Sequence, residues 1–265
     1  MRLIHLHQPH LPLQLARARA SEPFPSGPIV LGGRPWDPGQ VIDANPEARA
    51  LGVRRGMPLG SAHRLAPEAT FVDADSDADR ATAEAVFEAL AAFSPGLAGS
   101  TDPADSAFGL FEVQADGLEA LWGPEPVLIG RLVEALAGAL AGALPASDVP
   151  ASVVAPAPTA HAAPRAGVAG TRFAATIAAV HARPAAPIIV PLGGEAAFLA
   201  PRPAGLLTTD PDIRARLSRF GLRRIGAVAD LAGSALVARF GTEGARIHAR
   251  ARGETVWLLD RAAAA

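Results

Sequence analysis

Three histidines near the start of the chain are the first residues whose types and spacing could support chemistry. His5 and His7 lie two residues apart in a short apolar run, so they would point to the same side of a strand, and His10 follows closely. Neutral imidazoles at this spacing are zinc ligands in metal-dependent hydrolases. Packed or capping histidines are the alternative interpretation, because the other histidines fall in expected helices or a linker: His63, His161, His181 and His248.

Two groups of acidic residues could bind cations. Asp102 and Asp105 lie in a polar, irregular stretch, and carboxylates hold the metal ions of phosphoryl-transfer enzymes. Acids also alternate over residues 73–79, but this run lacks the glycine and the terminal glutamate of an EF-hand calcium loop. The run therefore favours the acidic N-terminus of a long helix, where negative charge complements the helix dipole.

Arg49 is a candidate to bind a phosphate group. Asn45 can cap a helix, Pro46 suits its first turn, and Gly52 can end it. Arg49 would then lie about one turn past the cap, near free amides that favour an anion. The alternative is a solvated or salt-bridged surface arginine.

The elements that would position these residues are short strands and helices. We expect strands over residues 3–6, 29–31, 40–42, 71–72 and 108–113, an irregular stretch over 8–12, and helices over 13–20, 46–51, 59–66, 80–92 and 126–144. A proline- and alanine-rich stretch over 145–164 indicates a linker, with a short strand possible at Val153–Val154. Residues 201–265 predict short helices joined at glycines.

The glycine-containing run over residues 167–179 predicts the end of a strand, followed by a turn and a helix of small residues. Glycines at such a turn allow either a phosphate loop or close packing of two backbones. The pattern alone is a weak phosphate signal, so close packing is the favoured interpretation.

Composition excludes several classes of function. The 265 residues contain no cysteine, lysine or tyrosine, so disulfides, thiolate metal sites and a catalytic lysine are excluded. With a net charge of −2, the protein is not expected to bind a long DNA duplex through electrostatic attraction alone. No signal peptide or membrane-spanning run is visible, and we expect a soluble, cytoplasmic protein.

Basic charge is concentrated at the C-terminal end, where residues 201–265 contain 11 arginines and 6 acidic residues. This excess suits a minor contact to a DNA backbone, and a solvated helical face is the alternative. The candidate backbone-binding residues are Arg219, Arg223, Arg224 and Arg239.

The run DANPEARALGVRRGMPLGSAHRLAP, residues 43–67, resembles the fingers segment of Y-family (UmuC/DinB-like) translesion DNA polymerases. The similarity extends over nearly the whole chain and is closest to the catalytically defective ImuB-like accessory subunits, in GVAGTRFAATIAA, AAFLAPRPAGLL and RFGTEGARIHARARG. It implies an α+β fold with a mixed-sheet palm from residues 1–12 and 78–200, small fingers from 13–77 and a helical, degenerate helix-hairpin-helix thumb from 201–265. Because the chain stops shortly after residue 259, we expect the family's little-finger domain and clamp-binding peptide to be absent.

The resemblance also assigns site residues. Arg49 takes the position of the arginine that touches the incoming triphosphate, Pro46 replaces its usual tyrosine neighbour, and Arg183 replaces a triphosphate-binding lysine. The positions of the metal-binding acids are occupied by other residue types: His7, Pro9, Ala107 and Phe108.

These assignments imply a noncatalytic scaffold, without a cofactor, in DNA-damage tolerance and SOS mutagenesis. Its implied partners are a RecA-like protein, an error-prone replicative-type polymerase, a sliding clamp and, weakly, DNA. Two alternatives remain: an active DNA-directed nucleotidyltransferase that uses Asp102 and Asp105 with magnesium, and a metal-dependent hydrolase that uses His5 and His7.

Overall fold

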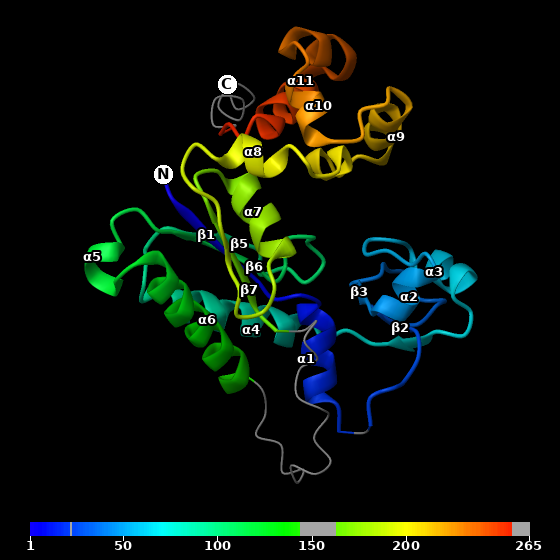
Figure 1. Cartoon of the computed structure of the whole chain (residues 1–265). Helices are drawn as coiled ribbons and strands as arrows, with labels where there is room; N and C mark the ends of the chain where they lie inside the picture. Colours follow the sequence, from blue (N-terminus) through cyan, green and yellow to red (C-terminus); the bar gives the residue numbers. More distant parts are fainter. Residues whose placement is uncertain (22, 144–162, 256–265) are drawn as a thin grey trace, which may run out of the picture. The chain divides into compact units, whose positions relative to one another are not determined.

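The chain forms a mixed α and β structure (Figure 1), here a computed structural model that describes residues 1–21, 23–143 and 163–255. The linker strand expected at Val153–Val154 lies outside these residues. Within them, no helix is both long and apolar enough to cross a bilayer. The strands are β1 (Leu3–His7), β2 (Ile29–Leu31), β3 (Asp43–Ala44), β4 (Thr70–Val72), β5 (Leu97–Gly99), β6 (Leu110–Gln114), β7 (Arg165–Ala169) and β8 (Ile188–Ile189). The helices are α1 (Leu11–Arg19), α2 (Pro46–Ala50), α3 (Leu59–Leu65), α4 (Ser76–Ala91), α5 (Glu119–Trp122), α6 (Glu125–Gly142), α7 (Arg172–His181), α8 (Glu195–Leu199), the 3₁₀ turn η1 (Ala204–Leu207), α9 (Pro211–Arg219), α10 (Ile225–Ala229) and α11 (Gly233–Ala251).

The strands belong to two sheets. A five-stranded sheet has the order β5-β6-β1-β7-β8, and a three-stranded sheet has the order β3-β2-β4. In the smaller sheet, Val30 lies opposite Ala44 of the antiparallel β3 and opposite Phe71 of the parallel β4. In the larger sheet, β5 pairs antiparallel with β6 and β7 pairs parallel with β8. Both sheets are mixed, which confirms the expected α+β class.

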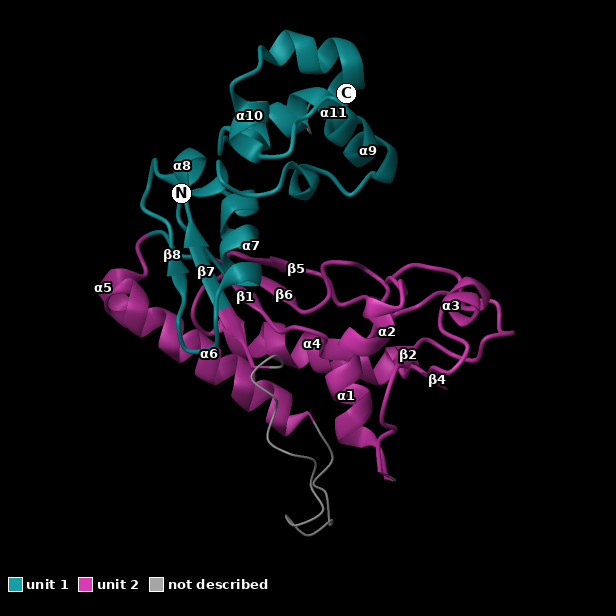
Figure 2. Cartoon of the chain, turned by 45° about the vertical axis from the view of Figure 1, so that its right-hand side comes forward, with its two compact units in different colours: residues 1–5, 114–116, 166–265 teal, residues 6–113, 117–165 magenta. Residues whose placement is uncertain are grey.

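The chain divides into two compact units (Figure 2). Unit 1 contains residues 1–5, 114–116 and 166–265, and unit 2 contains residues 6–113 and 117–165. The boundary passes through β1, whose first three residues belong to unit 1. The division into palm, fingers and thumb remains a prediction.

In unit 2, two long helices cover buried side chains of β6. Helix α4 packs against α6, and the rings of Phe87 and Phe111 meet edge to face with centroids 5.3 Å apart. Asp75 caps α4 by accepting a hydrogen bond from Ala78 N, and Arg19 Nη1 donates to the buried Asp79 at 2.6 Å. The acidic run is therefore the N-terminus of a helix, as expected, and this helix begins four residues earlier than the sequence indicated.

The small sheet of unit 2 and helices α2 and α3 enclose their own apolar cluster, which includes Val30, Val53 and Leu59. Asn45 caps α2 as predicted, since its Oδ1 accepts from Ala48 N at 3.0 Å and from Ile29 N at 2.9 Å. The strand expected over residues 40–42 is wrong. Val41 exchanges backbone hydrogen bonds with the loop at 56–57 instead of a strand, and β3 begins at Asp43.

Two other boundaries differ from the sequence prediction. Helix α1 begins at Leu11, inside the stretch expected to be irregular, because Pro12 lies in its first turn, where a missing N–H costs nothing. Strand β6 begins at Leu110 instead of residue 108, because Phe108 N bonds back to Asp105 O in a turn.

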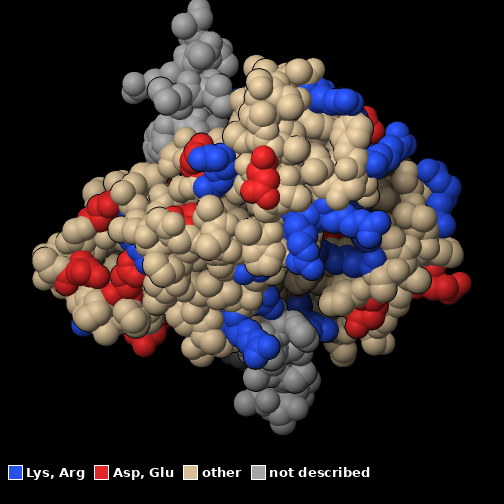
Figure 3. Space-filling view, turned by 45° about the horizontal axis from the view of Figure 1, so that its top comes forward, with Lys and Arg blue, Asp and Glu red and all other residues tan. Residues whose placement is uncertain are grey.

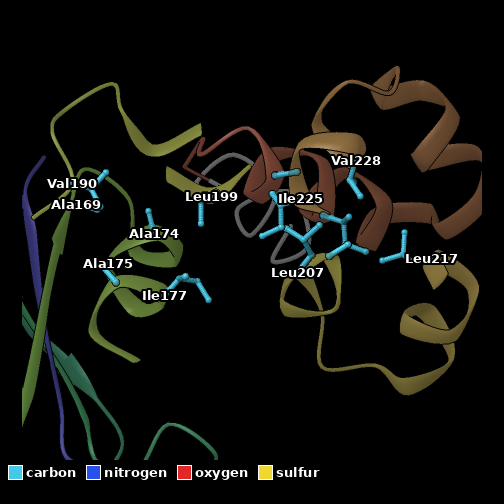
Figure 4. Close-up of a cluster of buried hydrophobic side chains, with 14 of the residues drawn as sticks. Ala169, Ala174, Ala175, Ile177, Val190, Leu199, Leu207, Leu217, Ile225 and Val228 are labelled. Carbon is cyan, nitrogen blue, oxygen red and sulfur yellow. The ribbon is translucent and has the colours of Figure 1, made fainter. Parts of the chain in front are cut away.

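Unit 1 is organised around one buried cluster, which α7 and the C-terminal helices share (Figure 4). Ala174 and Ile177 of α7 contribute to it, as do Leu207, Ile225 and Val228. Strand β7 and helix α7 approach each other so closely that a Cβ on Gly167 would lie 2.1 Å from Ala179 N. This contact confirms that the glycine-containing run packs two backbones together.

Candidate anion and nucleic-acid sites

The end of β1 and the turn before β6 lie side by side in unit 2. Gln8 N donates to Gly109 O at 2.8 Å, and a Cβ on Gly109 would lie 2.7 Å from Gln8 O. Gly109 also has a φ of +87°, which disfavours any side chain. The fold therefore brings the segment of His7 and Pro9 next to the segment of Ala107 and Phe108.

None of these four side chains is a carboxylate, and three are apolar. Pro9 and Phe108 are buried, and Ala107 is half-buried. Burial, and then the nearby Arg165 and His10, lower the pKa of His7 from 6.5 to about 4. His7 is therefore a neutral imidazole at pH 7, and its buried Nδ1 has no hydrogen-bond partner in the described part of the chain.

The donor set at this place does not fit a pair of divalent metal ions, which carboxylates would have to neutralise. The predicted substitutes are engaged in turns: Asp102 Oδ1 accepts from Ala104 N and Asp105 Oδ1 from Ala107 N, each at 2.9 Å. His5 is buried with its Nδ1 3.0 Å from Thr176 Oγ1. Across the described residues, no three histidine, aspartate or glutamate side chains are grouped so that they could hold a metal ion.

Arg49 is the predicted site residue with the most defined surroundings. Its Nη2 donates to Asp43 Oδ1 at 2.9 Å and its Nε donates to Ala44 O at 2.9 Å. The side chain is 42% exposed, whereas that of Asp43 is 1% exposed. The structure thus supports the salt-bridged interpretation of Arg49, with a buried partner that the sequence analysis did not identify.

Asp43 gathers donors from three places. Its Oδ1 also accepts from Ala44 N at 2.8 Å and lies 3.2 Å from His10 Nδ1, which must carry the proton because an ionised carboxylate can only accept. Burial alone would raise the pKa of Asp43, but the hydrogen bond from His10 and the charge of Arg49 outweigh it and hold that pKa below its usual value. Asp43 is therefore ionised at neutral pH.

His10 adopts a left-handed backbone conformation, with φ 53° and ψ 37°, at the position before α1. Such a conformation is uncommon outside glycine and persists where the surroundings fix it. The contact with Asp43 links this strained residue to the small sheet.

Arg55 connects the loop after α2 to the turn that holds Asp105. Its Nη2 donates to Asp105 O at 2.7 Å and also to Pro103 O. Burial lowers the pKa of Arg55, while the charges of Asp43 and Asp105 oppose that shift. Its buried Nε has no hydrogen-bond partner among the described residues, and no motif around position 55 predicts this role.

In unit 1, the glycine-containing turn after β7 is occupied by a side chain of the same unit. Gly170 N donates to Glu195 Oε1 at 2.8 Å, and a Cβ on Gly170 would lie 2.6 Å from that oxygen. Glu195 is buried. Arg183 lies after α7 in a tight turn, where Ala186 N donates to its carbonyl, and its side chain is exposed. Its phosphate-binding role stays a prediction.

The four predicted DNA-backbone arginines are exposed in unit 1, but two of them are engaged. The Arg239 guanidinium lies 4.8 Å from the centre of the Phe220 ring, and Arg224 Nη1 donates to Pro201 O at 2.5 Å. Arg216, which the sequence analysis missed, stacks on Phe240 and donates to Arg239 O at 2.9 Å. Arg219 and Arg223 lie at the end of α9 and in the loop that follows it.

Charged side chains on the face shown in Figure 3 lie in separate groups among uncharged residues. Basic and acidic groups both occur there, which fits the net charge of −2. Such a surface is better suited to a local contact with a phosphate backbone than to an extended electrostatic interaction along a duplex.

Comparison with known proteins places the chain among DNA polymerase homologues. Residues 15–138 match the impB/mucB/samB family. A DNA polymerase IV of Dehalococcoides mccartyi is 30% identical over 223 residues, which cover 82% of this chain and 49% of that relative. Protein ImuB of Caulobacter vibrioides is 32% identical over 191 residues, which cover 72% of this chain and 35% of that protein. The chain thus spans about half the length, or less, of these curated relatives.

A solved structure agrees with these matches at the level of the fold. The crystal structure of DinB from Sulfolobus solfataricus superimposes with a TM-score of 0.67 at 18% identity, covering 96% of this chain and 67% of the other.

Proposed function

Since the chain belongs to the impB/mucB/samB family of Y-family polymerase homologues and has their fold, we propose that it is a noncatalytic scaffold in DNA-damage tolerance. The observation that carries this proposal is the chemistry where the β1 end meets the turn before β6. His7, Pro9, Ala107 and Phe108 occupy the four positions that the sequence resemblance assigns to the family's metal-binding acids, and none of them is a carboxylate. Without carboxylates, the metal ions that align the reacting oxygens have no anionic ligands there to neutralise their charge.

Asp102 and Asp105 are poor substitutes because both lie in the turn before β6, where the Oδ1 of each accepts a backbone N–H, and β1 offers no partner acid. A metal ion bound by either carboxylate would find no acid on the β1 side to complete its ligand set. The proposal includes a role in the SOS response as a cytoplasmic pseudoenzyme, and the similarity to a protein named ImuB is consistent with a place in this group. In this role the chain would contact a RecA-like protein, an error-prone replicative-type polymerase, a sliding clamp and, through exposed arginines such as Arg219 and Arg223, DNA.

Primer extension tests the proposal. The chain is incubated with a primer–template duplex and all four deoxynucleotides, with either magnesium or manganese, beside an active DNA polymerase IV as the positive control. We expect no extension with either metal. Extension that is lost in Asp102→Ala or Asp105→Ala, but kept in Asp77→Ala on the exposed start of α4, would establish catalysis and refute the scaffold.

The second candidate is an active nucleotidyltransferase that uses these displaced acids with magnesium. The similarity to DNA polymerase IV at 30% identity is the observation that favours it. The same assay decides between the two, because the single-aspartate variants separate catalysis by this chain from a contaminating polymerase.

A further inference from the structure

The contact between Asp43 and Arg49 bears on whether this chain can hold a phosphate-bearing ligand. The exposed part of Arg49 is open to solvent, but Nη2 and Nε are directed back onto β3 by Asp43 and Ala44. Asp43 is buried and ionised, so its negative charge stays fixed beside the guanidinium. An approaching anion would therefore meet a cation that is already neutralised and a carboxylate that repels it.

Asp43 cannot easily withdraw from Arg49. Its Oδ1 accepts from Ala44 N and His10 Nδ1 as well, and each contact fixes its position. Its Oδ2 is buried and has no hydrogen-bond partner among the described residues, so turning the carboxylate away would not bring it into water. A buried charge that loses its cation is strongly unfavourable, which makes the pair persistent.

We propose that Asp43 is the resident counter-ion of Arg49 and prevents this site from binding free triphosphates or other polyphosphate anions. The side chain at position 43 thereby determines ligand specificity: a neutral isostere leaves the guanidinium charge uncompensated and opens the site to an anion. The inference concerns binding alone, and it holds or fails independently of whether the chain extends primers.

Isothermal titration calorimetry with inorganic tripolyphosphate, and separately with dATP without metal, measures this directly. We expect no saturable binding to the wild-type chain. Asp43→Asn keeps an oxygen that accepts hydrogen bonds but removes the charge, and it should bind tripolyphosphate saturably, at least about tenfold more tightly than the weakest affinity that the titration detects. The double variant Asp43→Asn with Arg49→Gln should lose this gain, and Asp77→Asn at an exposed position should not produce it.

Either of two results would overturn the proposal. One is a folded Asp43→Asn variant, verified by circular dichroism, that binds no more tightly than the wild type. The other needs no change at Asp43: if the wild-type chain binds tripolyphosphate saturably and Arg49→Gln abolishes that binding, Asp43 does not close the site. This second comparison can overturn the proposal even if the Asp43 variant does not fold.

Discussion

Asp43 in unit 2 and Glu195 in unit 1 are both buried carboxylates that accept N–H groups from positions where the sequence suggested a phosphate, but they do so with different partners. Asp43 faces a guanidinium and an imidazole together with a backbone amide. Glu195 accepts from the backbone amide of Gly170. At Arg49, the charge of the guanidinium is therefore compensated by a carboxylate, whereas at Gly170 the backbone N–H is occupied by a side chain that packs into the turn.

The largest expected effect is that of Asp43→Ala, which removes an acceptor shared by three donors. We expect the free energy of unfolding to fall by about 3 kcal/mol, at the low end for a broken buried ion pair because Arg49 is partly exposed and can be hydrated. Urea denaturation followed by circular dichroism measures it. Asp77→Ala, at an exposed position, should change stability by less than about 0.5 kcal/mol. If Asp43→Ala lowers the free energy of unfolding by as little as Asp77→Ala does, the contacts of Asp43 contribute no more to stability than a surface ion pair.

The lowered pKa of His7 predicts how the stability of the chain depends on pH. Its pKa is about 4 in the folded chain, below the value of 6.5 of an ordinary histidine, so the unfolded chain binds a proton first as the pH falls. Stability from this source is complete above pH 6.5 and is lost between about pH 6.5 and 4, by at most about 3 kcal/mol. His7→Gln should flatten the stability profile in this window.

The contribution of Asp43 to the same profile falls in a different pH range. Its pKa is depressed, so its stabilisation is present above the ordinary aspartate value and is lost as the pH drops below it. The test of His7 lies in the higher range. If the unfolding midpoints of the wild type and of His7→Gln fall in parallel from pH 6.5 to 4.5, the loss of stability in that range does not come from His7.

The smallest expected effect is at Glu195. Glu195→Ala leaves the Gly170 N–H without its acceptor and should cost about 1–2 kcal/mol, whereas Glu195→Gln keeps an oxygen and should cost less than about 1 kcal/mol. Thermal melts of the two variants measure the difference. If the glutamine variant is as unstable as the alanine variant, the charge of Glu195 matters and the contrast with Asp43 disappears.

Features that depend on near neighbours in the chain were predictable. The Asn45 cap of α2, the acidic start of α4 and the close packing at Gly167 each arise from residues within a few turns, and all three are confirmed. The strand expected over residues 40–42 was wrong because the partner of Val41 is a loop some fifteen residues later.

The residue types alone predict that positions 7, 9, 107 and 108 carry no carboxylate, and they predict where the helices around Arg49 begin and end. The tertiary structure alone decided that Arg49 is neutralised by Asp43, that His10 reaches the same carboxylate, and that Arg55 holds the turn of Asp105. The two kinds of contact differ in their separation along the chain. A helix cap bonds amides two or three residues away, whereas the partner of a buried charge comes from whichever elements folding brings around it.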